Sequence, residues 1–128
     1  MIERVLNFYE LKLNNREPVY VQAAHYVKRQ IWLRRAVTGD KLPSRREVAA
    51  QLGVNPNTVQ KAFKLMEDEG YVRTSSTLGS VVYVDEDVLA RIEAELTREL
   101  VRSFVESAKE IQLSFKTVVE LISEQWDE

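Results

Sequence analysis

Two closely spaced sets of helix start and stop signals most constrain how this chain can fold. Ser44 and Glu47 can form a capping box, in which each side chain bonds the backbone N–H of the other residue. Gly53 can end that helix, since glycine is favoured just beyond a helix C-terminus. Asn55 and Pro56 can begin another helix, because asparagine caps the first turn and proline is tolerated within it. The sequence therefore predicts two short helices joined by a tight turn, a helix-turn-helix.

The neighbouring segments complete a small domain around this pair. Gly70 can end the second helix of the pair, and apolar residues at helical spacing predict an earlier helix over about 18–36. Two β-prone runs, 71–74 and 81–84, are joined by the loop 75–80 and predict a β-hairpin. A helix-turn-helix followed by a hairpin is a winged helix-turn-helix.

Both ends of the chain extend this domain. Residues 9–13 alternate apolar and polar side chains, which predicts a short strand or an extended arm. Residues 85–128 contain no glycine or proline, and their apolar side chains recur every three or four positions. This pattern predicts one long amphipathic helix or two packed ones. We therefore expect a mainly α fold with a small β-hairpin, divided into a winged-helix domain (1–84) and a helical region (85–128).

The apolar stripe of residues 85–128 is larger than a domain of roughly 80 residues needs to cover its own hydrophobic core. We expect it to form the interface of a homodimer, as amphipathic helices do when they pack in pairs. The alternative is that the stripe packs only on the winged helix of its own chain. The residues predicted to make the dimer contact are Leu89, Ile92, Leu96, Leu100, Phe104, Ile111, Phe115, Val118, Ile122 and Trp126.

Charge is divided unevenly between the two regions. The formal net charge of −2 by itself argues against a nucleic-acid partner, because the phosphate backbone favours basic proteins. Residues 1–84, however, carry 13 basic and 8 acidic side chains, a net charge of +5. Residues 85–128 carry 5 basic and 12 acidic side chains, a net charge of −7. The basic domain suits DNA, and an acidic region held away from the duplex avoids repulsion.

Several classes of protein are excluded by composition. The chain has no cysteine and a single histidine, His25, which excludes disulfide scaffolds, thiolate zinc sites, iron–sulfur clusters and multi-histidine metal sites. Without a histidine pair or a nucleophile motif we expect no enzyme and no cofactor. No apolar run approaches the roughly 18 residues of a membrane span, and the start lacks a secretory signal. We therefore expect a cytoplasmic protein without a membrane partner.

The two helices of the predicted helix-turn-helix carry side chains that can contact DNA. Asn57 and Gln60 can hydrogen-bond adenine in the major groove, and Lys61 adds positive charge. Arg45 and Arg46 suit phosphate, or a guanine edge within reach. The full set of predicted DNA-contacting residues is Ser44, Arg45, Arg46, Asn55, Pro56, Asn57, Thr58, Gln60, Lys61, Lys64 and Gly79.

At these residues the sequence resembles the GntR family of bacterial transcription regulators. The run at 40–49, DKLPSRREVA, is similar to the family signature D-K/R-L-P-S-x-R-E-L-A, and the match continues through 51–59. Asn-Pro-Asn-Thr at 55–58 and Pro-Val-Tyr-Val-Gln at 18–22 are typical of the YtrA-like subgroup, as is a short helical C-terminal tail. The resemblance covers about residues 9–84.

The resemblance also implies site residues. Arg46 stands at the position of the DNA-contacting arginine of the family, and the recognition-helix contacts fall on Asn55, Asn57, Thr58 and Gln60.

The sequence departs from the family pattern at two places in this site. Pro56 stands where many relatives have an arginine, so base contacts must come from its neighbours. The hairpin sequence at 75–82, SSTLGSVV, lacks the basic pair and the first glycine of the family pattern R-R-G-x-G-T-F-V.

These features predict a transcriptional regulator, a repressor rather than an activator, that binds a pseudo-palindromic double-stranded DNA operator as a homodimer. The alternative is a winged-helix protein-interaction module without sequence-specific DNA binding, which the missing basic pair of the hairpin favours. The sequence allows a small-molecule effector without identifying it; such a molecule would bind at the dimer interface or near the winged helix.

Overall fold

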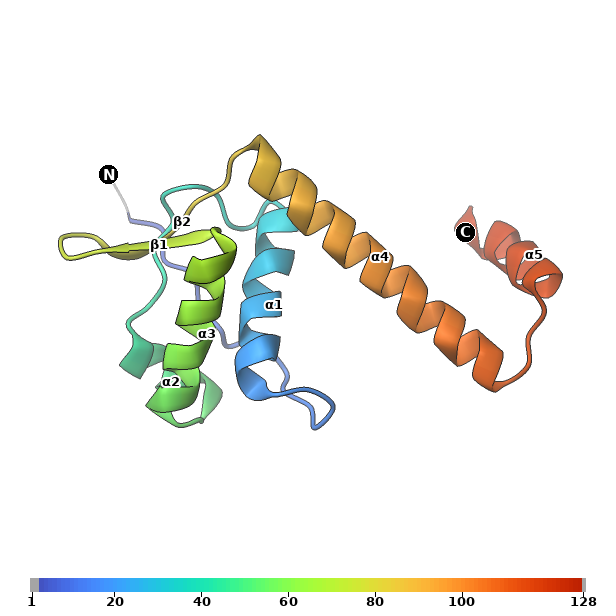
Figure 1. Cartoon of the computed structure of the whole chain (residues 1–128), viewed down its shortest axis with the longest axis horizontal. Helices are drawn as coiled ribbons and strands as arrows, with labels where there is room; N and C mark the ends of the chain where they lie inside the picture. The colour runs from blue at the N-terminus through green and yellow to red at the C-terminus, as the bar shows by residue number, and fades with distance from the viewer. Residues whose placement is uncertain (1–2, 128) are drawn as a thin grey trace. The chain divides into compact units, whose positions relative to one another are not determined.

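The computed structural model describes residues 3–127, which form five helices and one antiparallel β-hairpin (Figure 1). The mainly α fold with a small hairpin is therefore confirmed. The elements are, in chain order, α1 (Val19–Trp32), α2 (Arg45–Leu52), α3 (Pro56–Glu69), β1 (Val72–Ser75), β2 (Gly79–Val82), α4 (Glu86–Glu110) and α5 (Phe115–Trp126). No helix among the described residues is long and apolar enough to cross a membrane.

Internal contacts divide the chain into two units, Met1–Ile92 and Glu93–Glu128. The division expected from the sequence falls after residue 84, whereas the first turns of α4 belong to the first unit. Val88 and Ile92 explain this difference, because they are only 5% and 3% exposed.

The residues at the centre of the sequence that were predicted to begin and end helices do so. The Ser44 hydroxyl accepts the Glu47 backbone N–H at 3.1 Å, and the Glu47 carboxylate accepts the Ser44 N–H at 3.1 Å. Gly53 ends α2 at a φ of +68°, a left-handed conformation that side chains disfavour. The Asn55 side chain then caps α3 by accepting the Asn57 N–H at 2.8 Å. The turn between α2 and α3 is thus determined by local sequence.

The expected C-terminal end of the first helix is wrong, because α1 ends at Trp32 instead of residue 36. Arg34 has a φ of +63°, which is incompatible with a continuing right-handed helix. The Gln30 carbonyl accepts the backbone N–H groups of Arg35 at 2.9 Å and Ala36 at 3.1 Å. These two bonds close the helix terminus and turn the chain toward α2.

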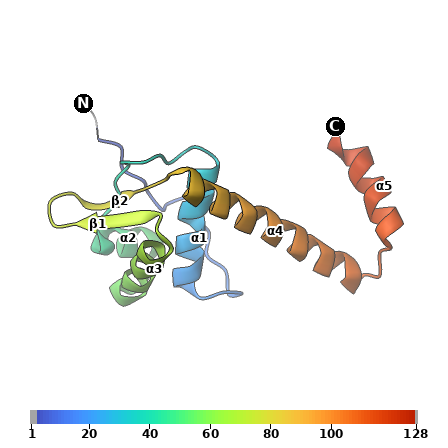
Figure 2. The ribbon, with the colours of Figure 1, turned by 45° about the horizontal axis from the view of Figure 1, so that its top comes forward.

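The hairpin has a shorter loop than predicted. Its strands pair from Val72 opposite Val82 to Ser75 opposite Gly79, which leaves three residues, 76–78, in the loop. The hairpin extends away from α1 in both views (Figures 1 and 2).

The first three helices enclose the core of the first unit. Val27 of α1, Val48 of α2 and Phe63 of α3 are all at most 1% exposed. Burying such a side chain contributes about 1.5–3 kcal/mol to folding. The buried Tyr71 hydroxyl donates to the Ala24 carbonyl at 3.1 Å, which ties the end of α3 to α1. This packing holds α3 by its apolar face and leaves its other face to solvent.

The N-terminal arm, residues 4–13, is held in place by one aromatic side chain and by backbone pairing. Phe8 is completely buried, with its ring centroid 5.3 Å from that of Tyr26. The Leu6 N–H donates to the Lys41 carbonyl and the Lys41 N–H to the Arg4 carbonyl, each at 2.8 Å. The alternation at residues 9–13 forms no strand.

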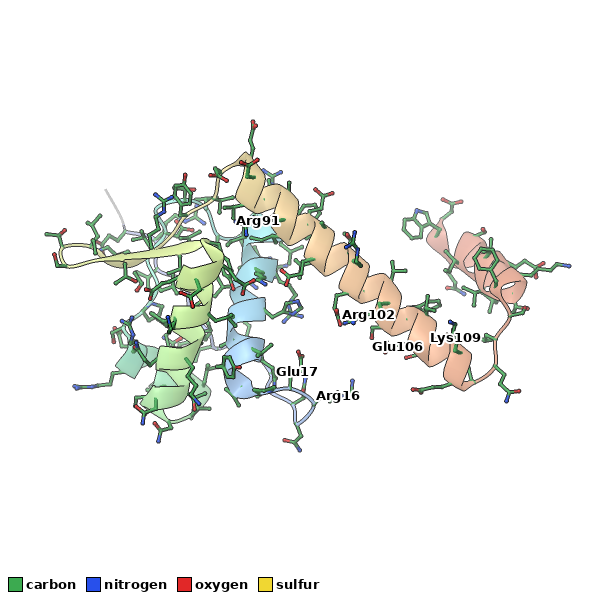
Figure 3. The ribbon with its side chains drawn as sticks, viewed as in Figure 1. Arg16, Glu17, Arg91, Arg102, Glu106 and Lys109 are labelled. Atoms are coloured by element: carbon green, nitrogen blue, oxygen red, sulfur yellow. The ribbon has the colours of Figure 1, made fainter. Side chains whose placement is uncertain are left out.

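The second unit contains the end of α4 and all of α5. The two helices are separated at Gln112, whose φ is +58°, and Ser114 caps α5 by accepting the Thr117 N–H at 3.1 Å. One of the two predicted alternatives was two packed helices; the structure has two helices, but α4 and α5 make few contacts with each other. Figure 3 labels Arg102, Glu106 and Lys109 on the part of α4 that belongs to this unit.

Candidate nucleic-acid interface

Helix α3 presents a polar stripe to solvent. Asn57, Gln60, Lys61 and Lys64 are all exposed and follow the i, i+3, i+4, i+7 spacing of one helical face. The side chains of Asn57, Gln60 and Lys61 make no hydrogen bond to any residue that the structure describes. Lys64 forms an exposed ion pair with Asp68 at 3.4 Å. Hydrogen-bond donors and acceptors that can contact a base edge are therefore available along this face.

The remaining predicted residues at the start of α3 have mainly structural roles. The Asn55 carboxamide oxygen is engaged in the cap, Pro56 occupies the first helical position, and the Thr58 side chain is half-buried. On the opposite face of the helix, Val59 and Phe63 are buried in the core. The stripe is thus presented by a helix whose orientation is determined by packing.

Arg45 and Arg46, at the start of α2, have different surroundings. The Arg45 guanidinium carbon lies 4.7 Å from the centroid of the Phe63 ring, and one of its nitrogens lies 3.4 Å from a Glu67 carboxylate oxygen. Its Nε is buried and has no hydrogen-bond partner in the part of the chain that the structure describes. Arg46 is exposed and makes no hydrogen bond or ion pair within residues 3–127. The free planar guanidinium of Arg46 is the one suited to bidentate contact with phosphate or guanine.

The capping box places a carboxylate beside these arginines. Bonds from the backbone N–H and the hydroxyl of Ser44 lower the pKa of the exposed Glu47 carboxyl. Glu47 and Ser44 are therefore occupied by the helix cap, and Ser44 contributes to the site chiefly by beginning α2.

The hairpin tip is neutral. Arg73 is the basic residue of the hairpin, and its guanidinium lies over the Tyr83 ring, 3.4 Å from the centroid, away from the loop. Gly79 has a φ of +71° and follows Leu78, whose side chain is 58% exposed. Thr74 and Ser80 join the strands through a hydroxyl–hydroxyl bond of 2.7 Å. The tip therefore offers hydroxyl and apolar groups in place of the positive charge usual at a phosphate contact.

The segment around Lys41 connects the hairpin to the helix-turn-helix. The Gly39 N–H donates to the Val82 carbonyl at 2.9 Å, and the Val82 N–H donates to the Asp40 carbonyl at 2.8 Å. The Leu42 N–H donates to the Ser80 carbonyl at 2.9 Å, two residues before the cap of α2. The hairpin and the start of α2 are therefore held in a defined relation by backbone bonds.

Sequence reasoning missed two stabilising features near the site. Lys28 of α1 lies 2.7 Å from Glu69 at the end of α3, and its side chain is 7% exposed. The Phe8 N–H donates to the side-chain oxygen of Gln51 in α2 at 2.7 Å. These contacts join residues 41 and 43 positions apart, and no local pattern could have indicated them.

The predicted dimer residues divide into three groups by exposure. Ile92 is buried within the first unit, which removes it from any surface open to a partner. Leu89, Leu96 and Val118 are half-buried. The exposed members are Leu100, Phe104, Ile111, Phe115, Ile122 and Trp126.

Comparisons with known proteins agree with this geometry. The family model described as "Bacterial regulatory proteins, gntR family" matches residues 19–82, from α1 through β2. The chain is 35% identical over 104 residues to an uncharacterized HTH-type transcriptional regulator, YhcF of Bacillus subtilis, covering 81% of this chain and 86% of that protein. It is 37% identical over 81 residues to the B. subtilis HTH-type transcriptional repressor YtrA, covering 62% of this chain and 61% of that protein.

Solved structures show the same arrangement. A GntR family transcriptional regulator from Listeria monocytogenes has a TM-score of 0.74 at 25% identity, covering 88% of this chain and 98% of that chain. YtrA from Sulfolobus acidocaldarius, a GntR-family transcription factor, has a TM-score of 0.56 at 30% identity, covering 81% of this chain and 99% of that chain. These relatives are transcription regulators, not enzymes. The chain therefore belongs to the GntR family and is a YtrA-like, DNA-binding transcriptional regulator of the helix-turn-helix type.

Proposed function

We propose that this protein is a homodimeric repressor that binds a pseudo-palindromic operator, with the polar stripe of α3 in the major groove. The observation that carries this proposal is that Asn57, Gln60 and Lys61 on one face of α3, and Arg46 on α2, are exposed and have no partner among the described residues. A major groove about 12 Å wide admits one helix, and these side chains match its hydrogen-bonding edges.

In this arrangement the two arginines of α2 have different roles, one in DNA contact and one in packing. Arg46 contacts phosphate or a guanine edge, and Arg45 holds α2 against α3 through Phe63 and Glu67. Because the hairpin tip is neutral, the hairpin adds hydroxyl contacts to the DNA backbone and little electrostatic attraction. Gly79 serves as a turn residue of the hairpin, since its positive φ favours glycine.

We infer that residues 93–127 form the dimer interface. The apolar side chains exposed there include Leu100 at 72%, Phe115 at 83% and Trp126 at 81%. Large apolar side chains that are exposed in one region of a protein commonly mark an interaction site. A two-fold axis through this interface would place two recognition helices on half-sites about 34 Å apart, or a multiple of that spacing.

Such a dimer bound at a promoter would prevent RNA polymerase from binding there, which would repress transcription. The B. subtilis relative YtrA, itself named a repressor, supports this direction of control. A regulator of bacterial genes acts where the chromosome is, so we place the protein in the cytoplasm.

A mobility-shift assay tests this function. The probe is double-stranded DNA from immediately upstream of the coding sequence, and a shuffled duplex of equal composition is the competitor. We expect binding at low salt that is at least about tenfold tighter to the upstream duplex. Asn57→Ala should reduce this preference, while Asn15→Ala, an exposed amide in the turn before α1, should leave it unchanged. Absence of any shift at low salt, where phosphate contacts are strongest, would refute the proposal.

The alternative is a protein-docking module, and the specific observation in its favour is the neutral hairpin tip with its exposed Leu78. Binding through the tip to a protein would be insensitive to substitution of Arg46. The DNA function predicts the opposite, so the Arg46→Ala variant separates the two.

A further inference from the structure

An ion pair with a buried lysine joins α1 to the last turn of α3, at the end of α3 opposite to the proposed base contacts. The Lys28 ammonium lies 2.7 Å from a Glu69 carboxylate oxygen and 5.5 Å from the centroid of the Tyr71 ring. The Lys28 side chain is 7% exposed and the Glu69 side chain 33%. Helices α1 and α3 lie side by side (Figures 1 and 2). The ion pair is therefore part of the contact that determines how α3 is oriented against α1.

The position of Glu69 is unfavourable for the helix that carries it. The last turn of α3 contains Glu67, Asp68 and Glu69 and no basic residue. The helix dipole is negative at the C-terminus, so carboxylates there are destabilising. Burial of Lys28 adds a desolvation cost, and the attraction between paired charges often does no more than offset such a cost. Helix stability and burial therefore do not account for this pair, and a role in orientation does.

Apolar packing by itself leaves some freedom in the angle of α3. Val59, Phe63 and Met66 bury the inner face of the helix, but hydrophobic contact is non-directional. The charged hydrogen bond of 2.7 Å in the ion pair is directional and fixes one point of α3 with respect to α1. In the same turn, Glu67 lies 3.4 Å from Arg45 of α2. The last turn of α3 is thus tied by charge to both of the other helices in the core.

The separation between this tie and the base contacts makes the angle of α3 critical. Asn57 precedes Glu69 by 12 residues, which is about 18 Å along a helix axis. A rotation of about 5° around the C-terminal end of the helix would displace Asn57 by about 1.5 Å. Side chains of a functional site must be held to within about 0.5 Å of their working geometry. A small loss of orientation therefore disrupts base contacts more than phosphate contacts, which a flexible lysine can follow.

We propose that Lys28 and Glu69 are positioning residues for base recognition. The pair fixes the angle of α3 against α1, so that Asn57 and Gln60 reach base edges in the major groove. Phosphate contact by Lys61 depends less on this angle, so the pair determines sequence preference more than total affinity. The effect on sequence preference rests on the proposed operator binding, whereas the effect on the angle of α3 does not.

The test replaces both partners by uncharged side chains of similar volume, as Lys28→Met with Glu69→Gln in the full chain. Replacing both members of a buried pair is often neutral or stabilising, whereas removing one leaves the other buried and unpaired. We therefore expect a thermal unfolding midpoint at or above that of the wild type. A midpoint more than about 5 °C lower would show that the pair serves stability, and the proposal would fail. The control variant, Glu99→Gln with Arg102→Gln, removes an exposed ion pair within α4.

The angle of α3 is measured without DNA, from residual dipolar couplings of backbone N–H groups in ¹⁵N-labelled protein. In the wild type and in the control variant, we expect the couplings of α1 and α3 to fit one rigid arrangement. In the Lys28→Met, Glu69→Gln variant, the couplings of α3 should fit a different or an averaged angle with respect to α1. Couplings identical to those of the wild type would overturn the proposal.

Base recognition is measured by mobility shift with the upstream duplex and the shuffled duplex. In the Lys28→Met, Glu69→Gln variant the preference for the upstream duplex should fall at least about threefold, while affinity for the shuffled duplex stays within about twofold of the wild type. An equal loss on both duplexes, or an unchanged preference, would contradict a role in base recognition. If the wild type itself shows no preference, the proposed operator binding is refuted, and the dipolar couplings still decide whether the pair orients α3.

Discussion

The different surroundings of Arg45 and Arg46 make a prediction that separates DNA contact from structural support. Arg46→Ala should weaken operator binding and leave folding stability unchanged, because the side chain is exposed and has no partner among the described residues. Arg45→Ala should lower stability, because its guanidinium packs on Phe63 and pairs with Glu67. The two residues are adjacent and identical in type, so each serves as the control for the other.

The magnitudes follow from the contacts. An arginine over an aromatic ring contributes about 0.5–1 kcal/mol, and a half-exposed ion pair about 0.2–1 kcal/mol. The unpartnered, buried Nε of Arg45 offsets part of this sum, which leaves a loss of about 1 kcal/mol in Arg45→Ala. For a unit of this size, that loss lowers the unfolding midpoint by about 4–8 °C. Arg46→Ala should change stability by less than about 0.5 kcal/mol but cost about 1–3 kcal/mol of operator binding.

Thermal unfolding by circular dichroism and titration of labelled operator measure the two effects. The expected loss of operator binding in Arg46→Ala corresponds to a rise in Kd of about fivefold to about 150-fold. If Arg45→Ala weakens binding as much as Arg46→Ala while unfolding at the wild-type temperature, Arg45 is the contacting residue and the reasoning from burial is refuted.

Four further outcomes are expected. Lys61→Ala should lower the slope of log affinity against log salt by about 1, measured by titration at several salt concentrations, and an unchanged slope would exclude a phosphate contact. Phe8→Ala should destabilise the first unit by about 3–5 kcal/mol in urea unfolding, because the side chain is completely buried; a loss below about 1 kcal/mol would mean that the arm is not part of the core. The double substitution Leu100→Arg with Phe104→Arg in the full chain should convert a dimer to a monomer in sedimentation, and a persisting dimer would locate the interface elsewhere. The folded-state pKa of Glu47 is lowered, so the ionised carboxylate stabilises the fold at neutral pH, and this stabilisation is lost as the pH falls below the ordinary glutamate pKa and through the lowered value. The Glu47→Gln variant should lack this part of the acid dependence of unfolding free energy. Identical curves of unfolding free energy against pH for the variant and the wild type would contradict the prediction.

Local signals predicted the centre of the fold well. Ser44, Glu47 and Asn55 act through bonds to backbone groups two or three residues away, so the sequence spacing alone determines them. The error at the end of α1 has the opposite cause. The apolar spacing continues through Ala36, but Arg34 adopts a left-handed conformation and Ala36 is buried after the helix has ended. Periodicity cannot distinguish a helical residue from one that reaches the core by a turn.

The candidate site shows the same limit. Sequence spacing identified the residues of α3 and the arginine pair, because helical periodicity determines which side chains share the exposed face. It could not distinguish Arg45 from Arg46, since the difference lies in Phe63 and Glu67 of another helix.

The sequence by itself determined the order and type of the elements, the helix-turn-helix and the division of charge, because caps, turns and periodicity act over a few residues. Only the tertiary structure decided that Phe8 anchors the arm, that Ile92 is buried within the first unit, and that the buried Gln22 side chain bonds the backbone of Asn14 and Glu17. These outcomes depend on which groups distant in sequence come into contact. Burial and hydrogen bonding between such groups are properties of the packed chain and leave no periodic pattern in the sequence.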